Sequence, residues 1–372
     1  MRTRSAQKAY MRITRWFPNE VLTAIIDNAA RADQATLCRV STLFHALALP
    51  VLNRRVILRT DYTEPEVLEA FCNAIIRNLA RADSVRSFTF INEPSVVLVE
   101  DFLIQSLKLM TRLEHLFIDD FRPRGVVSRL ADIDFPNLWS CTLEFHAEAW
   151  EQHVAKFLAR HPTIMHLRLQ TWAAEGEHLM PEGTLLPELQ YYHGPLHLLS
   201  GFSKHSLQAV RTSWTGRETS SFMENLSAQT GLDLASLSLY YLDAAEVSDV
   251  LIHLSKHMPH LEKLELHFWD APTSTAVIVN DVNAFQRRFK RLAYLAMAFS
   301  SLDESHYAVV ESDNERRAFE MWTNASLSLR GCCIGQTAWR KVGQKWEDCS
   351  KKLFRSEAGF EVFDQLSMVD ND

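Results

Sequence analysis

The chain has 372 residues, of which 47% are hydrophobic and 23% are charged. This balance is typical of a folded globular protein and excludes a largely disordered chain. The formal net charge of −7 argues against a general affinity for nucleic acid or for an anionic membrane surface.

The first residues, MRTRSAQKAYMR, are basic but lack the apolar segment of a secretory signal, so we expect residues 1–13 to form a disordered tail. No apolar run of about 18 residues is present, which argues against a transmembrane helix. The six cysteines show no C-x-x-C spacing. Free thiols and the lack of an export signal predict a cytoplasmic or nuclear protein.

Residues 14–60 have the pattern of a small helical domain. Pro18 suits the first turn of a helix, Asp33 is a candidate N-cap for a second helix, and a third helix is expected to end before Pro50. Three short helices bury little apolar surface, so apolar side chains should remain for a partner. An apolar stripe at helical spacing follows Pro18: Val21, Leu22, Ile25 and Ile26.

From about residue 80, one pattern returns along the chain: an apolar residue, a second three positions later and a third two positions after that. A clear copy is Leu261-x-x-Leu264-x-Leu266. Most successive copies begin 25 to 28 residues apart, with one shorter step between Leu189 and Leu207 that suggests a repeat without its helix. The copies begin at Val85, Leu113, Leu138, Ile164, Leu189, Leu207, Leu234, Leu261 and Leu292, with a degenerate one near Leu327.

The alternation within each copy predicts a short strand, and helical stripes lie between copies. One such stripe contains Val247, Val250, Leu251 and Leu254, and another contains Trp150, Val154, Phe157 and Leu158. Nine or ten strands and only 11 glycines disfavour an eight-stranded α/β barrel. A doubly wound nucleotide fold is disfavoured because no glycine-rich fingerprint or P-loop is present.

The repeats resemble leucine-rich repeats over roughly residues 80–335, although the usual asparagine after the strand is missing. The predicted fold is therefore α/β: a three-helix module, then an open solenoid over residues 61–335, with parallel strands on the concave face and helices on the convex face. Residues 336–372, which carry Trp339, Val342, Trp346 and Leu353, are expected to cap the last repeat and to end in an acidic tail.

The segment Phe17-Pro18-Asn19-Glu20-Val21-Leu22, followed by Leu37-Cys38-Arg39-Val40-Ser41, resembles an F-box of the kind found in fungal F-box-like proteins. This resemblance implies a substrate-recognition subunit of an SCF-type cullin–RING ubiquitin ligase. Its partners would be the ligase adaptor (S-phase-kinase-associated protein), through it a cullin, and a protein substrate. The residues implied in adaptor binding are Phe17, Pro18, Val21, Leu22, Ile25, Leu37 and Val40. The alternative is a repeat scaffold or inhibitor whose N-terminal helices only cap the solenoid.

Strand geometry predicts which side chains could bind a substrate. Leu264 and Leu266 are expected to face the core, so the residues between and beside them face the other side. In a solenoid such positions form one concave surface, the usual binding face. The same offset selects His115, Phe117, Asp119, His166, Arg168, Gln170, Tyr191, His193, Ser236, Ser238, Tyr240, Lys263, Glu265, His267 and Tyr294.

No pattern predicts catalysis or a cofactor. The histidines show no H-E-x-x-H or H-x-H spacing, and no G-x-S-x-G sequence is present. Asp119 and Asp120 are adjacent on a predicted strand and should point to opposite faces. Cys332 and Cys333 are expected to form a small buried pair. We therefore expect a non-enzymatic binding protein without metal or cofactor.

Overall fold

The computed structural model describes most of the chain. The described residues are 17–60, 65–92, 100–120, 129–145, 151–171, 186–195, 198–199, 202, 207–213, 234–268, 280, 282–285, 288–299, 312–325, 328–335 and 337–360. The predicted disordered tail at 1–13 and the predicted acidic tail after residue 360 lie outside them.

The fold is α/β, and the described residues contain thirteen strands that are hydrogen-bonded in chain order from β1 to β13. The pairings described from β1 to β3 and from β5 to β11 are parallel, as in an open α/β solenoid. The chain divides into two compact units, Met1–Cys141 and Thr142–Asp372.

The first unit begins with three helices, α2 (Asn19–Asp27), α3 (Arg31–Leu37) and α4 (Thr42–Asn53). A small core of Ile26, Ala48 and Val51 holds them together. The buried Gln34 side chain donates hydrogen bonds of 3.0 and 2.9 Å to the carbonyls of Ile26 and Ala29, which satisfies backbone acceptors at the end of α2.

Two details of these helices differ from the sequence prediction. Helix α3 begins at Arg31, with Ala30 at the N-cap, so Asp33 lies in the first turn and is not the cap. Pro50 lies inside α4 instead of ending it. The helix can continue to Asn53 because proline removes only one backbone donor and the Ser41 side chain caps the start of the helix. The predicted three-helix arrangement itself is present.

The first unit continues into a parallel sheet. Residues 55–60, which the sequence analysis assigned to the helical module, instead form β1 and pair with β2. The buried side chains of Phe88, Phe90, Leu116 and Ile118 form its core. The elements are β1 (Arg55–Thr60), α5 (Pro65–Ile76), α6 (Leu79–Ser84), β2 (Ser87–Asn92), α7 (Glu100–Leu109) and β3 (His115–Asp120), with β4 (Ser140–Phe145) at the division between the units.

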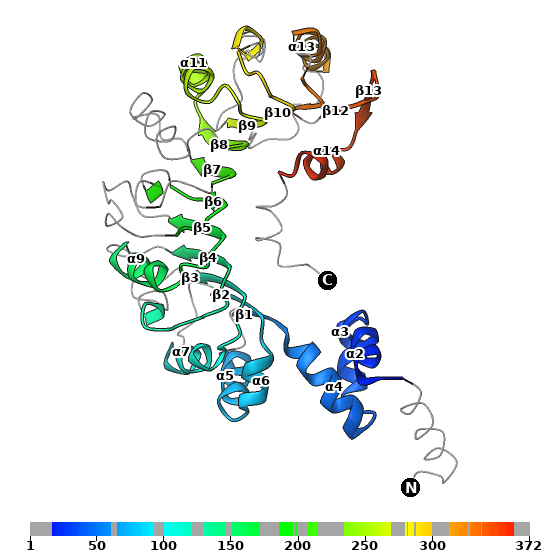
Figure 1. The fold of residues 1–372 in the computed structure, drawn as a ribbon, viewed down its shortest axis with the longest axis vertical. Coiled ribbons are helices and arrows are strands. Elements are labelled where there is room, and N and C mark those ends of the chain that lie inside the picture. Colours follow the sequence, from blue (N-terminus) through cyan, green and yellow to red (C-terminus); the bar gives the residue numbers. More distant parts are fainter. Residues whose placement is uncertain are drawn as a thin grey trace. The chain divides into compact units, whose positions relative to one another are not determined.

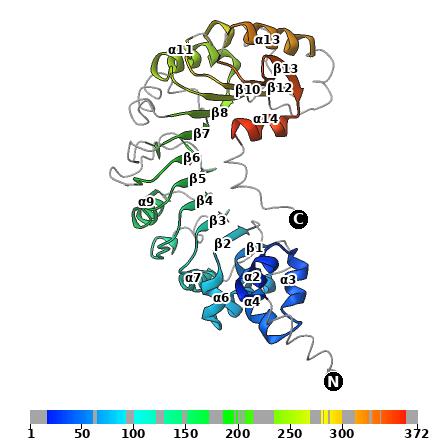
Figure 2. The same ribbon diagram turned by 45° about the vertical axis from the view of Figure 1, so that its right-hand side comes forward.

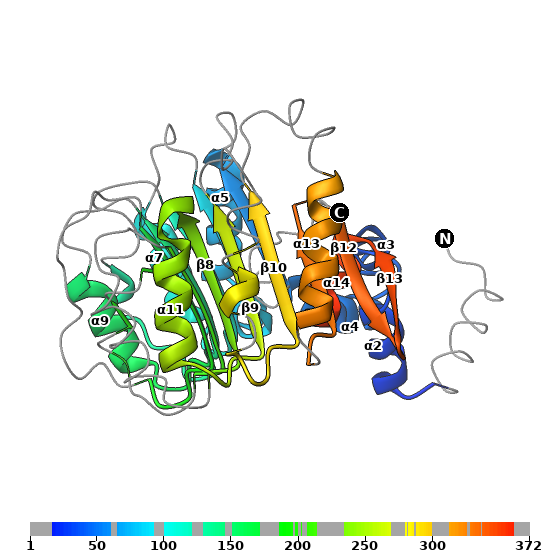
Figure 3. The same cartoon turned by 90° about the horizontal axis from the view of Figure 1, so that it is seen from above.

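The second unit holds the remaining repeats. Its strands β8, β9 and β10 run side by side in Figure 3, with α11 in front of them. The described residues between β6 and β7 contain no α-helix, in agreement with the short repeat. The elements are α9 (Glu151–Arg160), β5 (His166–Thr171), β6 (Tyr191–His193), β7 (Ala209–Ser213), β8 (Ser236–Leu242), η2 (Ala244–Glu246), α11 (Val247–His257), β9 (Lys263–Phe268), β10 (Tyr294–Phe299), α13 (Ser312–Ala325) and β11 (Gly331–Ile334).

The predicted repeat positions are confirmed by the strands. Each predicted first apolar residue from Val85 to Leu292 lies two positions before a strand and is buried, at 5% exposure or less. The degenerate last copy was misplaced by two residues, because Leu329 rather than Leu327 holds this position before β11. Within each unit these residues belong to the buried core, which a single repeat could not build alone.

The second unit ends in an antiparallel pair, β12 (Thr337–Val342) and β13 (Lys345–Cys349), followed by α14 (Lys351–Ala358). Figures 1 and 2 place α14 on one face of the strands β10 to β12 and α11 and α13 on the other. In the segment predicted as a cap, Val342 and Leu353 are exposed at 45% and 38%, so they contribute little to packing. Trp339, Phe354 and Phe360 are the buried aromatic residues among its described residues.

Candidate functional site

The strand-side face is the face of the second unit's sheet on which α14 lies, opposite α11 and α13 (Figure 1). Five side chains on five neighbouring strands occupy one register position on it, and we call them the polar row: Arg168, His193, Arg211, Ser238 and Glu265. Period-two geometry puts them on the face opposite the buried leucines, and the sequence analysis selected all of them except Arg211.

At the β5 end of the polar row, Arg168 is held by two neighbours. Its guanidinium lies 2.9 Å from the carboxylate of Glu144 and donates a 2.9 Å hydrogen bond to the side-chain oxygen of Gln170. Both charged side chains are mostly buried, at 15% and 12% exposure. Burial raises the pKa of Glu144 above its ordinary value, although the charge of Arg168 opposes this.

At the β9 end of the row, Glu265 is fully buried among cationic and hydroxyl groups. Its carboxylate accepts a 2.8 Å hydrogen bond from the Ser238 hydroxyl, lies 3.1 Å from the His267 ring and 3.6 Å from the guanidinium of Arg211, and pairs with Arg355 of α14. Arg211 is itself buried and also donates to the carbonyl of Phe360.

The electrostatic balance at Glu265 is opposite to that at Glu144. Burial pushes the pKa of Glu265 up, but the hydrogen bond and charge of His267 and the charges of Arg355 and Arg211 outweigh it and lower the pKa to about 2. Between the two ends, burial together with the charges of Arg168 and Arg211 lowers the pKa of His193 well below its ordinary value, so the ring is neutral at pH 7.

Aromatic rings flank the polar row. The rings of His166 and Tyr191 lie 4.4 Å apart, and Tyr240 stacks on His267 with centroids 3.9 Å apart. Arg211 lies 5.2 Å from the centre of the Tyr240 ring. From β5 to β8 the face therefore presents half-buried aromatic and polar side chains, which are common at protein interfaces.

From β9 onward, α14 covers the face. Phe354 packs near Tyr294, with ring centroids 6.2 Å apart, and Gly331 lies so close beneath both rings that an added Cβ would sit 3.0–3.1 Å from them. Phe354, Ala358 and Phe360 join a buried cluster on this face. Glu265, Ser236 and Ser238, which were predicted as exposed binding residues, are buried, while Lys263, His267 and Tyr294 are half-buried.

In the first unit, the predicted face residues are His115, Phe117 and Asp119, all half-buried. The His115 ring meets the edge of Trp139 at a centroid distance of 4.3 Å, and burial is the main cause that lowers the pKa of His115. Phe117 lies in register with Thr89 of β2, on the face opposite the buried Leu116 and Ile118.

The predicted adaptor-binding residues fall into two groups. Leu22 is buried and Leu37 packs against the helical core, so both hold the three helices together. The other five are exposed; the large apolar ones are Phe17 at 47%, Val21 at 41%, Ile25 at 57% and Val40 at 43%, and Pro18 lies beside Phe17.

The described part of the chain holds no group of three or more histidine, cysteine or acidic residues suited to a metal ion. Neither Cys332 nor Cys333 forms a disulfide, and both are buried as predicted. Burial raises the pKa of the Cys332 thiol well above its ordinary value. The side chain of Asp120 is outside the described residues. No helix among the described residues has the length and apolar character needed to cross a membrane.

The sequence analysis missed three residues of this site. Glu144 and Arg211 follow the same strand offset that selected Arg168 and Glu265, so that rule could have found them. Arg355 contacts Glu265, which is 90 residues away in the sequence, and no local sequence pattern predicts such a contact. A comparison with known protein families found no match, and a search of the curated proteins found none either.

Proposed function

We propose that the protein is a substrate-recognition subunit of an SCF-type cullin–RING ubiquitin ligase, in which the three N-terminal helices bind the ligase adaptor. The observation that carries the proposal is the exposed apolar patch of Phe17, Val21, Ile25 and Val40. A module that only capped the solenoid would bury such side chains, whereas a docking module leaves them for its partner.

The spacing of the patch supports a helix-face contact. Phe17, Val21 and Ile25 stand four residues apart, so they follow one side of α2 and its entry, while Leu22 and Ile26 point into the helical core. Full burial of one such side chain in an interface is worth about 1.5–3 kcal/mol, so a few of them can supply a stable contact.

The substrate would be a protein bound on the strand side of the repeats. In the second unit, Arg211, Ser236 and Ser238 are buried, so this role falls to the half-buried aromatic residues of β5 to β8, which are His166, Tyr191 and Tyr240. In the first unit, Phe117 and His115 are the corresponding candidates. Mixed charges and aromatic rings suit a protein surface better than a nucleic-acid backbone.

The adaptor proposal is tested by co-purification of the full chain with the ligase adaptor. We expect wild type to form a complex and the double variant Val21→Glu/Ile25→Glu to bind at least about 100-fold more weakly, because two charges would be buried in an apolar contact. Thermal unfolding should shift by no more than a few degrees, since both side chains are exposed.

The matched control is Val67→Glu/Leu79→Glu. These side chains are exposed to a similar degree, 48% and 65%, and lie on α5 and α6 of the same unit. The control should retain adaptor binding. A folded wild-type protein that fails to bind the adaptor would contradict the proposal.

One observation favours the alternative, in which the helices only cap a repeat scaffold. Helix α4 ends at Asn53 and β1 begins at Arg55, and Arg31 donates a 3.0 Å hydrogen bond to the Arg55 carbonyl. The helices are therefore attached directly to the first strand. Adaptor binding by wild type distinguishes the two functions, because a cap has no reason to bind it.

A further inference from the structure

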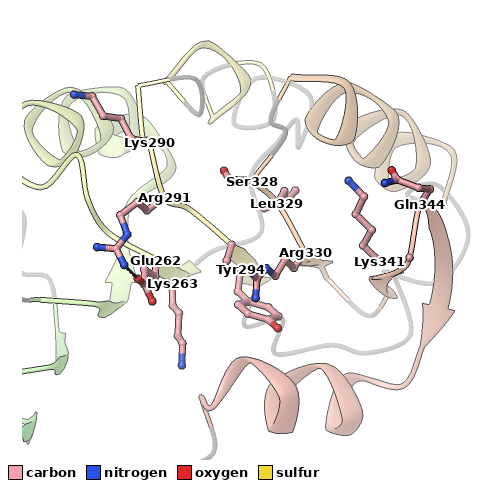
Figure 4. A pocket seen from close by; sticks show the side chains of 12 residues that line it. Glu262, Lys263, Lys290, Arg291, Tyr294, Ser328, Leu329, Arg330, Lys341 and Gln344 are labelled. Atoms are coloured by element: carbon pink, nitrogen blue, oxygen red, sulfur yellow. Dashed lines mark hydrogen bonds and ion pairs between the residues drawn. The ribbon is translucent and has the colours of Figure 1, made fainter.

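A cavity of about 640 Å³ lies in the second unit, at the edge of the sheet where β9, β10 and β11 begin. Lys263 and Tyr294 are the first residues of β9 and β10, Arg330 immediately precedes β11, and Lys341 is the last residue but one of β12 (Figure 4). The cavity is formed within one unit by backbone that three parallel strands hold in register.

The lining is strongly basic in a chain whose net charge is −7. It contains five cationic side chains and one carboxylate, Glu262, which already pairs with Arg291. Within the described residues, the remaining four cationic side chains have no ion-pair partner. They are Lys263, Lys290, Arg330 and Lys341.

Two of these cations are partly removed from water, so their charges are less well solvated than those of fully exposed side chains. Lys263 and Lys341 are half-buried. Burial lowers the pKa of Lys263, with Glu262 acting weakly in the other direction. The Lys263 ammonium lies beside Gly359 at the end of α14, where an added Cβ would be 3.0 Å from it. An anion in the cavity would offset this concentration of like charge.

The arrangement of the cations indicates the form of the anion. Figure 4 shows Lys290 and Lys341 at opposite sides of the cavity, with Arg330 and Lys263 between them. A single phosphate could meet only some of these groups, so the ligand must carry several charged groups along its length. The Tyr294 hydroxyl and the Gln344 amide are further polar groups of the lining.

We propose that this cavity binds a ligand that carries two or more linked phosphate groups. Each phosphate monoester carries about 1.5 to 2 negative charges and three acceptor oxygens, so two or three groups match the four unpaired cations. Neutralising the four cations with carboxylates would require about four acidic side chains of a peptide, and each would lose conformational entropy on binding. The site is independent of the adaptor-binding helices.

The test is isothermal titration of the full chain with inorganic tripolyphosphate at low salt. We expect saturable binding of one molecule per chain, with orthophosphate binding at least about tenfold more weakly because it offers a single group. Binding should weaken as salt is raised. The variant Arg330→Glu/Lys341→Glu should bind tripolyphosphate at least about tenfold more weakly.

The matched control, Lys256→Glu/Lys352→Glu, changes the net charge equally at exposed positions outside the cavity. It should keep affinity within about threefold of wild type. Arg330→Gln/Lys341→Gln provides a second test if charge reversal disturbs folding, which thermal unfolding will show. The proposal is overturned by unsaturable binding to wild type, by equal loss in the control, or by a hexaglutamate peptide that binds as tightly as tripolyphosphate.

Discussion

Helices α2 and α14 are both short and amphipathic, but α2 leaves two apolar residues exposed beside its buried Leu22 and Ile26, whereas α14 buries its aromatic residue. On α2, Val21 and Ile25 remain 41% and 57% exposed, while on α14 Phe354 is 1% exposed. Helix α14 also places Arg355 on a buried carboxylate of the sheet. An apolar stripe on a helix predicts a packing surface, but it does not tell whether another segment of the chain or a partner protein packs against it.

The largest expected difference between the two helices is in stability. Phe354→Ala should lower the free energy of unfolding by about 3–5 kcal/mol, because it opens a cavity among Ala296, Cys333 and Phe360. Ile25→Ala should change it by less than about 0.5 kcal/mol, because the side chain is exposed. Urea unfolding followed by circular dichroism measures both.

This comparison would fail if Phe354→Ala unfolded at the same urea concentration as wild type. In that case α14 would not be part of the core, and the β9–β11 region of the strand-side face would be open to a partner. Leu353→Ala is the internal control, since its side chain is 38% exposed on the same helix and should have a small effect.

A somewhat smaller loss is expected for Glu265→Gln, because it leaves the buried Arg211 and the paired Arg355 without their carboxylate. The pKa of Glu265 is about 2 in the folded state, below its ordinary value. Its ionised form therefore contributes stability above pH 5, on the order of 3 kcal/mol, which is lost as the pH falls from about 5 to 2. The measurement is the pH dependence of urea unfolding.

Glu265→Gln has no carboxyl to protonate at this position, so it should not show the part of the loss in unfolding free energy that wild type shows between pH 5 and 2. The free energies of unfolding of the two proteins should therefore converge near pH 2. Parallel curves for the two proteins between pH 5 and 2 would show that the charge of Glu265 does not stabilise the fold. Unfolding should be followed at constant ionic strength, because salt screens the exposed ion pairs of the surface.

The smallest effect is expected for Glu144→Gln, the matched substitution at the other end of the polar row. Burial raises the pKa of Glu144 despite the 2.9 Å contact with Arg168, so its ionised form is less favoured in the folded state than in the unfolded chain. We expect a change below about 1 kcal/mol at pH 7, measured in the same urea titration. A loss equal to that of Glu265→Gln would show that the two buried pairs are energetically alike.

The repeats could be read from the sequence because each one carries its own signal. A residue such as Leu261 is buried wherever the repeat stacks, and the alternation after it fixes which side chains face the core. The three N-terminal helices were predictable for the same reason, since their stripes are local. Helix ends were less certain: the tertiary fold tolerates Pro50 inside α4.

What covers each face was decided only by the tertiary structure. The offset rule correctly placed Glu265 opposite the leucines, but only packing of α14 makes it a buried ion-pair residue instead of an exposed binding residue. The basic cavity likewise joins Lys263 of β9 to Arg330, which immediately precedes β11, and to Lys341 of β12. Sequence periodicity predicts the direction of a side chain relative to its own backbone. Burial and charge pairing depend on contacts with segments that are distant in the sequence.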